Sequence, residues 1–378
     1  MTNRVPDGLL KKIDVVIGTR PEAIKMAPVV AELKERKNCT VRIIATGQHT
    51  DMLTQALDYF SLFADVNLGI MKKSQSLDYI TSAVIQGVGE VFDDVRPDAV
   101  LVHGDTTTTF AAALSAFYRQ IPIGHVEAGL RSEDMTCPFP EEMNRVLTDR
   151  IATWWFAPTV WAEKNLLREG VCRNKIYVTG NTVIDALYST VEKNSPPKAE
   201  CLKQLVDQER FLLLTAHRRE SWGKPLESIC SAVLEILKRH GEYRVLVPMH
   251  KNPSVRETMR GVLGGDERVI LCDPIDYPDF VWALSHCTLI LSDSGGVQEE
   301  ATALCKPVLI LREVTERPEA VQNGSGILVG TDSCRIISEA NRILSDREVY
   351  DDIRKRCERN PFGDGKASVR IADVLLQE

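Results

Sequence analysis

The chain has 378 residues, which at about 150 residues per domain indicates two domains of similar size. Its composition is 44% hydrophobic and 26% charged, with 23 Gly and 18 Pro, and this excludes a disordered, collagen-like or coiled-coil chain. A formal net charge of −7 and a pI near 5.7 argue against a nucleic acid as the main partner.

No apolar stretch reaches the roughly 18 residues that a membrane-spanning helix needs, and residues 1–12 lack the apolar segment of a signal peptide. The ten cysteines are scattered singly, without a C-x-x-C pair. Cysteines inside apolar runs, such as Cys230 and Cys305, are typical of reduced structural thiols. These features predict a cytoplasmic protein with no membrane segment and no metal site.

Short β-branched runs alternate with longer helical patterns along the whole chain. In the first half they predict strands at residues 13–17, 41–45, 99–102 and 121–126, with helices that include 27–37 and 107–119. In the second half they predict buried strands at residues 211–215, 243–247, 269–271, 288–291 and 307–311. Strands that alternate with helices are typical of parallel βαβ units with right-handed crossovers.

A polar stretch, residues 189–209, separates the two halves. We therefore predict an α/β fold of two Rossmann-like, doubly wound domains with a cleft between them. The predicted domains are residues 1–190, residues 200–358, and a C-terminal helix over 359–378 that packs back toward the first domain. In doubly wound sheets ligands bind beyond the carboxyl ends of the strands, so the functional residues are expected there.

The first predicted strand leads into Gly18-Thr19-Arg20-Pro21-Glu22-Ala23-Ile24-Lys25. A proline in the first turn marks a helix N-terminus. Arg20 and Lys25 place two cations beside the free N–H groups of that terminus, which suits a phosphate-bearing ligand. Two solvated surface cations are the alternative. The chain has neither G-x-G-x-x-G nor a Walker A sequence, which disfavours a dinucleotide or P-loop site.

A late predicted strand leads into Ser292-Asp293-Ser294-Gly295-Gly296-Val297-Gln298-Glu299-Glu300. Two glycines let the backbone approach an anion closely, and Ser294 adds a hydroxyl at the helix start. Glu300 follows at a distance that suits hydrogen bonds from ribose hydroxyls. This order favours a nucleoside diphosphate sugar as ligand, with a plain glycine-rich helix cap as the alternative.

Three acids and one histidine follow other predicted strands or rigid turns, namely Asp105, Glu127, Glu141 and His217. Charged groups at such apolar margins are costly unless they are paired or used in chemistry. Asp105 precedes a run of threonines, so a helix N-cap is its alternative role. His103 and His125 lie within strand ends, and we expect them to be hydrogen-bonded core histidines.

Several segments together resemble the non-hydrolysing UDP-N-acetylglucosamine 2-epimerases. They are residues 18–25, 103–108, 125–131, 140–142, 217–220, 292–300, 316–319 and 360–365. The match is collinear from about residue 13 to residue 375 and therefore covers nearly the whole chain. The hydrolysing relatives resemble the chain less, because it keeps the threonine run after Asp105 instead of an arginine-containing loop.

The resemblance implies a GT-B-like homodimer that interconverts UDP-N-acetylglucosamine (UDP-GlcNAc) and UDP-N-acetylmannosamine (UDP-ManNAc) without NAD or another cofactor. It implies that the catalytic residues are Asp105, Glu127, Glu141 and His217. By the same residue matching, the substrate-binding residues are Arg20, Lys25, Ile275, Phe280, Ser294, Gly295, Gly296, Glu300 and Arg317. The expected route eliminates UDP to give 2-acetamidoglucal and adds it back after protonation of C2 on the opposite face.

Two other functions remain as alternatives. A GT-B glycosyltransferase would share the nucleotide-binding loop but transfer the sugar to an acceptor; three acids together favour an epimerase, because a transferase usually needs one base. A non-catalytic sensor of nucleotide sugars would not need Asp105, Glu127, Glu141 and His217. Neither alternative explains the motifs as completely as the epimerase does.

The resemblance also bears on regulation, because some bacterial members are activated by a second UDP-GlcNAc beside the active site. The matching positions are Gln48, Asp51, Ser74, Glu141, Arg218 and His250, and of these Gln48, Arg218 and His250 are the residue types expected. Asp51 stands where such members carry Gln, and Ser74 where they carry Arg. An acid repels a diphosphate and a lost arginine removes a bidentate phosphate partner, so we predict weak or absent activation.

Overall fold

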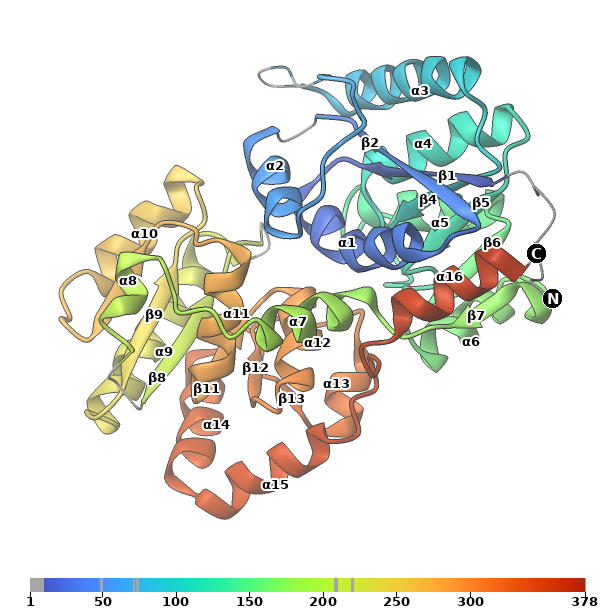
Figure 1. Cartoon of the computed structure of the whole chain (residues 1–378). Helices are drawn as coiled ribbons and strands as arrows, with labels where there is room; N and C mark the ends of the chain where they lie inside the picture. The colour runs from blue at the N-terminus through green and yellow to red at the C-terminus, as the bar shows by residue number, and fades with distance from the viewer. Residues whose placement is uncertain are drawn as a thin grey trace. The chain divides into compact units, whose positions relative to one another are not determined.

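The computed structural model describes residues 10–47, 50–70, 72, 75–206, 210–218 and 221–377. The chain divides into two compact units (Figure 1). Unit 1 consists of Met1–Ala186 and Gly363–Glu378, and unit 2 of Leu187–Phe362. Within the described ranges, no helix is both long and apolar enough to cross a bilayer.

Unit 1 is built on a seven-stranded sheet in the order β3-β2-β1-β4-β5-β6-β7, in which every neighbouring pair is parallel. Its strands are β1 (Lys11–Ile17), β2 (Cys39–Ala45), β3 (Val66–Asn67), β4 (Ala99–His103), β5 (Ile123–Val126), β6 (Trp154–Ala157) and β7 (Ile176–Val178). The order reverses between β1 and β4, so the sheet is doubly wound.

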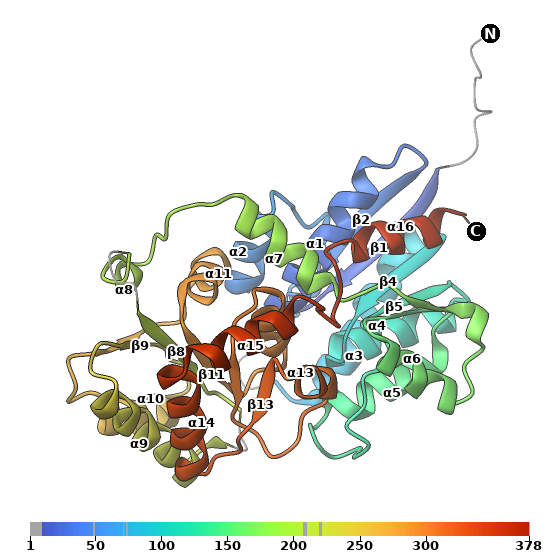
Figure 2. The ribbon, with the colours of Figure 1, turned by 90° about the horizontal axis from the view of Figure 1, so that it is seen from below.

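The helices of unit 1 are α1 (Arg20–Glu35), α2 (Thr50–Tyr59), α3 (Leu77–Asp94), α4 (Thr107–Tyr118), α5 (Glu141–Ile151), α6 (Val160–Arg168), a 3₁₀ turn (Arg173–Lys175) and α16 (Ala367–Gln377). Helix α4 packs between α3 and α5, and α1 packs against α2 and α16 (Figure 2). Apolar side chains of α3 and α4 meet those of β1, β2, β4 and β5 in one buried core.

Unit 2 has a six-stranded parallel sheet in the order β10-β9-β8-β11-β12-β13. The strands are β8 (Phe211–Thr215), β9 (Arg244–Pro248), β10 (Val269–Cys272), β11 (Leu289–Ser292), β12 (Val308–Ile310) and β13 (Gly326–Leu328). One core joins this sheet to α9 (Lys224–Arg239), α10 (Pro253–Leu263) and α14 (Ser333–Ser345). A second core joins it to α8 (Glu200–Lys203), α11 (Tyr277–His286) and α12 (Gly295–Ala303). The remaining helices are α13 (Pro318–Asn323), α15 (Arg347–Cys357) and α7 (Thr182–Glu192), which runs from unit 1 into unit 2.

The predicted fold class is confirmed, because both sheets are parallel and doubly wound. The strands singled out in the sequence are all present, whereas β3, β6, β7 and β13 were not singled out. These four have only two to four residues each, too few for a clear alternating pattern. Helix α1 begins at Arg20, which confirms the helix start predicted from Pro21, and it continues through Pro28 to Glu35.

Parallel strands bring their carboxyl ends to one edge of each sheet. In unit 1, the neighbours β1, β4 and β5 end directly before the segments that begin with Gly18, Gly104 and Glu127. In unit 2, the neighbours β8 and β11 end before His217 and Asp293. Strand order thus brings together residues that lie tens of positions apart in the sequence.

The C-terminal helix α16 is attached to unit 1 by one buried carboxylate. Asp185 accepts hydrogen bonds from the backbone N–H groups of Ala367 and Ser368, at 3.2 and 2.8 Å, and from the Ser368 hydroxyl at 2.6 Å. These N–H groups belong to the first turn of α16 and have no partner within the helix. At the outer side of the helix, Asp373 pairs with Arg36 at 2.9 Å.

We expect Asp185→Ala to lower the free energy of unfolding by about 1–2 kcal/mol, because it removes a helix cap. Asp373→Ala is the matched control on the same helix; it breaks a half-exposed ion pair, and such pairs contribute at most about 1 kcal/mol. Urea unfolding of both variants checks the difference. Equal losses in the two variants would show that Asp185 does not anchor α16.

Candidate active site

The loop between β1 and α1 is held by the buried carboxylate of Glu22. Its Oε2 accepts from the backbone N–H groups of Gly18 and Thr19 at 2.6 and 2.7 Å, and its Oε1 accepts from the hydroxyl of Thr106 at 2.5 Å. Burial raises the pKa of Glu22, although these hydrogen bonds oppose the shift. A side chain at Gly18 would collide with the Thr108 hydroxyl, so the loop closes tightly onto the start of α4.

Glu127 is a buried acid in a strained backbone conformation. It follows β5 with a φ of 68°, a left-handed conformation that costs a non-glycine residue about 1–2 kcal/mol. Its Oε1 accepts from Lys25 Nζ at 2.5 Å and from Asn181 Nδ2 at 2.8 Å. Lys25 therefore faces this acid, rather than standing as one of two exposed cations at the helix start. Strain kept at a buried charge is typical of a functional residue.

The other oxygen of Glu127 faces a neutral histidine. Oε2 lies 3.7 Å from Nε2 of His103, which ends β4. His103 is only 4% exposed, and its Nε2 has no hydrogen-bond partner among the described residues. Burial lowers the pKa of His103 to about 4, with the charge of Lys25 acting in the same direction. The expectation of a hydrogen-bonded core histidine is therefore wrong for the Nε2 atom of His103.

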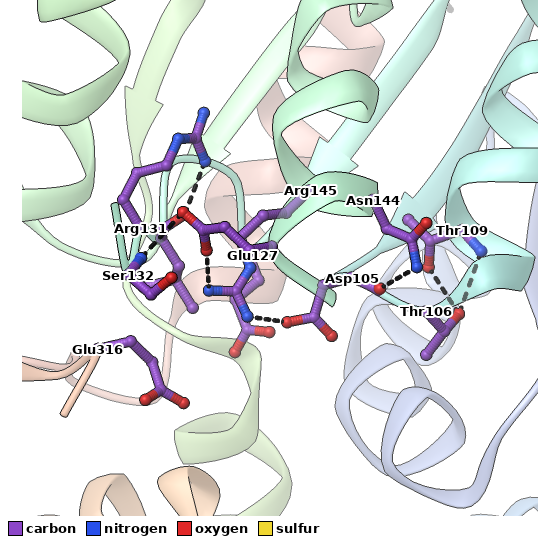
Figure 3. Close-up of polar contacts among 12 residues, drawn as sticks. Asp105, Thr106, Thr109, Glu127, Arg131, Ser132, Asn144, Arg145 and Glu316 are labelled. Carbon is purple, nitrogen blue, oxygen red and sulfur yellow. Dashed lines mark hydrogen bonds and ion pairs between the residues drawn. The ribbon is translucent and has the colours of Figure 1, made fainter. Parts of the chain in front are cut away.

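Asp105 is held by two residues at the start of α5 (Figure 3). Its carboxylate pairs with the Arg145 guanidinium, and its backbone carbonyl accepts from Asn144 Nδ2 at 2.9 Å. Arg145 is in turn fixed by Glu142, which is buried and lies 2.9 Å away. Thr106, and not Asp105, caps α4, because its hydroxyl accepts from the Thr109 N–H. The alternative role of Asp105 as a helix cap is therefore excluded.

His125 links the loops that carry Asp105 and Glu127. Its Nδ1 lies 2.6 Å from Asp149 and its Nε2 lies 2.8 Å from the Gly104 carbonyl. The ring therefore bridges a carboxylate and a backbone carbonyl. The same Asp149 accepts from the backbone N–H of Gly129 at 3.1 Å. The expectation of a hydrogen-bonded core histidine is confirmed for His125, and its partners fix the turns beside both acids.

The two remaining candidates of unit 1 begin helices. Glu141 is the first residue of α5 and half-buried, whereas its neighbour Glu142 is fully buried. The sequence pattern could not separate these two acids, but burial does, because only Glu142 is committed to holding Arg145. Arg20 is the first residue of α1 and also half-buried.

In unit 2 the central acid is Asp293, which follows β11 and is fully buried. Its Oδ2 accepts from the backbone N–H groups of His217 and Arg218 at 2.8 and 2.9 Å. Its Oδ1 lies 3.1 Å from Nδ1 of His217. Burial by itself raises the pKa of Asp293, but the nearby His217 and the backbone hydrogen bonds outweigh it and lower this pKa. Asp293 thus holds the backbone of His217 by hydrogen bonds, while its Oδ1 lies beside the ring without a hydrogen-bond partner among the described residues.

A second buried acid gathers the arginines of unit 2. Glu316 lies 2.7 Å from Arg317, 3.2 Å from Arg218 and 2.5 Å from Arg312. Burial opposes ionisation of Glu316, but the three guanidinium charges outweigh it and hold its pKa well below the usual range. Glu299 adds one more carboxylate, 2.6 Å from Arg317. The cluster gathers three guanidinium groups at this edge of the sheet, which suits an anionic ligand.

The glycine-rich start of α12 lies against the same arginine cluster. A side chain at Gly295 would collide with the Arg317 guanidinium, so glycine permits their close approach. Ser294 precedes the helix without capping it through its hydroxyl. Glu300 is buried on the same helix and accepts from the Tyr277 hydroxyl at 3.0 Å. Among the other predicted ligands, Gly296 follows Gly295, Ile275 is buried just before α11, and Phe280 is half-buried on α11.

The predicted regulatory positions are only partly described. Gln48 and Ser74 lie outside the described residues, and the side chain of Asp51 does as well. Arg218 belongs to the Glu316 cluster. The ring of His250 stacks on His217, with centroids 5.9 Å apart. Burial, and then the charge of His217, lowers the pKa of His250.

Sequence reasoning did not assign roles to Glu22, Arg145, Asp149, Asp293 or Glu316. All five carry a charge and are at most 4% exposed. Burial of a charge is itself a signal of pairing or function. Asp293 and Glu22 stood inside quoted motifs, where their position after a strand could have drawn attention. Within the described ranges, no cluster of three or more His, Cys, Asp and Glu side chains is arranged to hold a metal ion.

Comparisons with known proteins give one consistent result. A sequence model of the UDP-N-acetylglucosamine 2-epimerase family matches residues 31–376. The UDP-N-acetylglucosamine 2-epimerase of Salmonella typhimurium is 47% identical over 370 residues, which cover 96% of this chain and 98% of the relative.

Solved structures agree with this result. The UDP-GlcNAc 2-epimerase of Neisseria meningitidis, bound to UDP-GlcNAc, superposes with a TM-score of 0.91 at 45% identity and covers 97% of this chain and all of its own. The enzyme of Methanocaldococcus jannaschii, in complex with UDP-GlcNAc and UDP, has a TM-score of 0.84 at 35% identity over 97% of this chain and 100% of its own. A kitacinnamycin glycotransferase, at 10% identity and a TM-score of 0.62 over 97% of this chain and 98% of its own, shares the fold alone.

The neutral state of His103 has a measurable effect on stability. Its folded-state pKa of about 4 lies below the ordinary value of 6.5, so between these values the unfolded chain binds more protons. The free energy of unfolding should therefore fall as the pH drops from 6.5 to 4, by up to about 3 kcal/mol from this residue. Glu127, Lys25, His125 and Asp105 are the charged groups around it.

We expect His103→Gln to reduce the pH dependence of the unfolding free energy between pH 4 and 6.5. Urea titrations at several pH values check this, with the exposed His286→Gln as the control. A variant that keeps the full wild-type slope would contradict the neutral, buried state of His103.

Proposed function

Because the chain belongs to the UDP-N-acetylglucosamine 2-epimerase family, we propose that it is an isomerase that interconverts UDP-GlcNAc and UDP-ManNAc by eliminating UDP and adding it back. The observation that carries this mechanism is the strained, buried Glu127 with Lys25 on one oxygen and neutral His103 near the other. The family likeness also supports a cytoplasmic homodimer.

The chemistry requires a proton to leave C2 while the bond from C1 to the UDP oxygen breaks. The electron pair of the C2–H bond forms the double bond of 2-acetamidoglucal, and UDP leaves with the pair of the C1–O bond. The return step adds a proton to C2 from the opposite face as the UDP oxygen adds to C1. Acid–base groups are therefore needed on both faces of C2.

Unit 1 supplies the acid–base groups in this proposal. Glu127 exchanges the C2 proton on one face, and Lys25 holds its Oε1 in place as the charge of the carboxyl group changes. In this proposal Nε2 of the neutral His103 ring, 3.7 Å from Oε2, becomes the acceptor of a hydrogen bond once Glu127 is protonated. Asp105, held by Arg145, and Glu141 provide the further acid–base groups.

Unit 2 supplies the nucleotide side. The start of α12 at Gly295 and the positive cluster around Arg317 suit the diphosphate. His217, oriented by Asp293, stabilises the charge that develops on the departing UDP. The remaining ligands follow the family match: Arg20, Ser294 and Gly296 for the phosphates, Ile275 and Phe280 for the uracil, and Glu300 for the ribose.

The test is turnover of UDP-GlcNAc alone in D₂O, followed by proton NMR. We expect UDP-ManNAc to form without any acceptor and to carry deuterium at C2, because elimination and re-addition exchange this proton with solvent. Glu127→Gln should lower kcat by about 100-fold or more, within the range of general acid–base catalysis. Glu90→Gln, at an exposed position of α3, is the matched control.

Three outcomes would count against the proposal. Product that carries only protium at C2 would exclude exchange by elimination and re-addition. Glu127→Gln with wild-type kcat would remove Glu127 from the chemistry. Consumption of UDP-GlcNAc only when a sugar acceptor is added would favour the glycosyltransferase alternative.

A second test addresses Asp293 as the residue that positions His217. In Asp293→Asn an amide NH₂ replaces one of the two carboxylate oxygens. It then opposes either the backbone N–H groups of His217 and Arg218 or the His217 ring, so we expect the imidazole to lose its orientation. By analogy with carboxylate-oriented histidines in other enzymes, we expect kcat to fall by about 100-fold or more. UDP affinity should change little, which calorimetry checks.

The control for this variant is Asp351→Asn, which removes an exposed ion pair on α15. The pH dependence of kcat is measured as well, because a loss of packing alone would not shift it. Equal losses of kcat and UDP affinity in Asp293→Asn, with an unchanged profile, would mean that Asp293 only supports the fold.

We also propose that activation by a second UDP-GlcNAc is weak, since Asp51 and Ser74 replace the amide and guanidinium of regulated relatives. Each replacement removes a charged hydrogen bond that contributes about 1.5–3 kcal/mol. Pure UDP-ManNAc should therefore be converted without a lag and with hyperbolic kinetics. A lag that trace UDP-GlcNAc abolishes would contradict this.

A further inference from the structure

Glu127 is held by a loop at the edge of its sheet as well as by Lys25. Asn181 stands in the loop between the edge strand β7 and α7 and is 2% exposed. Its Nδ2 donates to Oε1 of Glu127 at 2.8 Å, and its Oδ1 accepts from the backbone N–H of Val183 at 3.0 Å. Because that N–H can only donate, the amide oxygen must face Val183 and the NH₂ must face Glu127.

The amide bears on which oxygen of Glu127 exchanges a proton. Oε1 accepts from Asn181 and also from Lys25 Nζ at 2.5 Å. Two donors occupy the two lone pairs of this oxygen. The other oxygen, Oε2, lies 3.7 Å from the neutral ring of His103. A proton that Glu127 takes up is therefore expected on Oε2.

The loop before α7 is fastened by the C-terminal segment of the same unit. Arg370 of α16 donates to the Thr179 carbonyl at 2.9 Å, and Asp364 accepts from the same guanidinium at 2.7 and 2.8 Å. The backbone of Gly363 lies against the loop, since a Cβ at this position would come within 3.1 Å of the Cα of Gly180. The loop is thus held by residues from the opposite end of the chain.

We propose that Asn181 is a positioning residue that fixes Oε1 of Glu127 and leaves Oε2 for the C2 proton, and that Arg370 supports it from α16. The inference rests on the proposed function, in which Glu127 exchanges this proton. Asn181 itself exchanges no proton, because an amide does not titrate. It holds one oxygen by a hydrogen bond that is stronger when the carboxylate is ionised.

The plain structural role for Asn181 is that of a helix cap, since its Oδ1 accepts from an N–H in the first turn of α7. Aspartate caps a helix as well as asparagine does. Asn181→Asp therefore keeps the cap and replaces the NH₂ by an oxygen that opposes Oε1 of Glu127. The two roles predict opposite results for this one variant.

The test is the pH dependence of kcat for UDP-GlcNAc in Asn181→Asp. We expect kcat at neutral pH to fall about tenfold or more, the effect of losing one hydrogen bond to a charged group. A second carboxylate beside Glu127 disfavours its ionised form, so the acid limb of the profile should move to higher pH by about one pH unit or more. The titratable groups around Glu127 and His103 stay in place in this variant: Lys25 on α1, His103 on β4, His125 on β5 and Asp105 in the loop after β4.

Asn174→Asp is the matched control, because it adds the same charge at an exposed position of the same unit. Kd for UDP, measured by calorimetry, should be unchanged in both variants, since unit 2 holds the nucleotide in the proposed function. Asn181→Asp with a wild-type kcat and pH profile would mean that Asn181 only caps α7, and the inference would be wrong.

The support from α16 is tested by Arg370→Ala, with Gln377→Ala at the exposed end of the same helix as the control. We expect kcat to fall by about threefold to tenfold, because Arg370 acts on the loop through one hydrogen bond to the Thr179 carbonyl. Arg370→Lys, which keeps a donor, should restore part of the loss. A loss in Arg370→Ala no larger than in the control would exclude α16 from the positioning of Asn181.

A double-mutant cycle between Asn181 and Glu127 tests their contact without any turnover. Urea unfolding is measured for wild type, Asn181→Ala, Glu127→Ala and the double variant. The equilibrium constant for unfolding of the double variant should be about tenfold lower than the product of the single effects predicts. Independent effects would contradict the inference. Wild-type protein that forms no UDP-ManNAc would overturn the proposed function instead, and the cycle would still decide the contact.

Discussion

The central constraint on unit 1 is the burial of an ionised carboxylate, Glu127, directly after the central strand β5. Taking an ionised carboxylate out of water costs several kcal/mol unless a close partner offsets it. Lys25 supplies that partner from a different βα unit, and Asn181 adds a hydrogen bond to the same oxygen. The second oxygen faces His103, which burial keeps neutral. The ion pair with Lys25 uses only Oε1 of Glu127. The other oxygen, Oε2, therefore lies beside the uncharged ring of His103.

Other acids of unit 1 work as supports for this arrangement. Glu22 ties the Gly18 loop to the start of α4, and Asp149 reaches the loops of Asp105 and Glu127 through His125 and Gly129. Each support is a carboxylate that accepts two or more hydrogen bonds from different elements. The groups to which we assign acid–base chemistry, Asp105 and Glu127, therefore stand on loops whose backbone is fixed, and such a fixed geometry is what acid–base catalysis needs.

Unit 2 applies the same principle to the opposite charge. Asp293 is a buried acid beside His217, and Glu316 is a buried acid that pairs with the arginines. Their negative charges offset the repulsion between cations that lie at one edge of the sheet. The arginine cluster beside the glycine-rich start of α12 suits a diphosphate through both its guanidinium groups and the backbone N–H groups of the helix.

The sequence by itself determined the class of the fold, most of its strands and the positions where charged residues follow strands. These properties are local, since the period of apolar residues and the turn residues lie within one segment. The tertiary structure decided which charges meet. Lys25 with Glu127, Arg145 with Asp105, and Asp293 with His217 are each pairs from distant segments. Their contacts depend on strand order and on the burial of each side chain, which no local pattern encodes. For the same reason the sequence predicted one role for both His103 and His125, because the physical difference lies in which neighbour each ring faces.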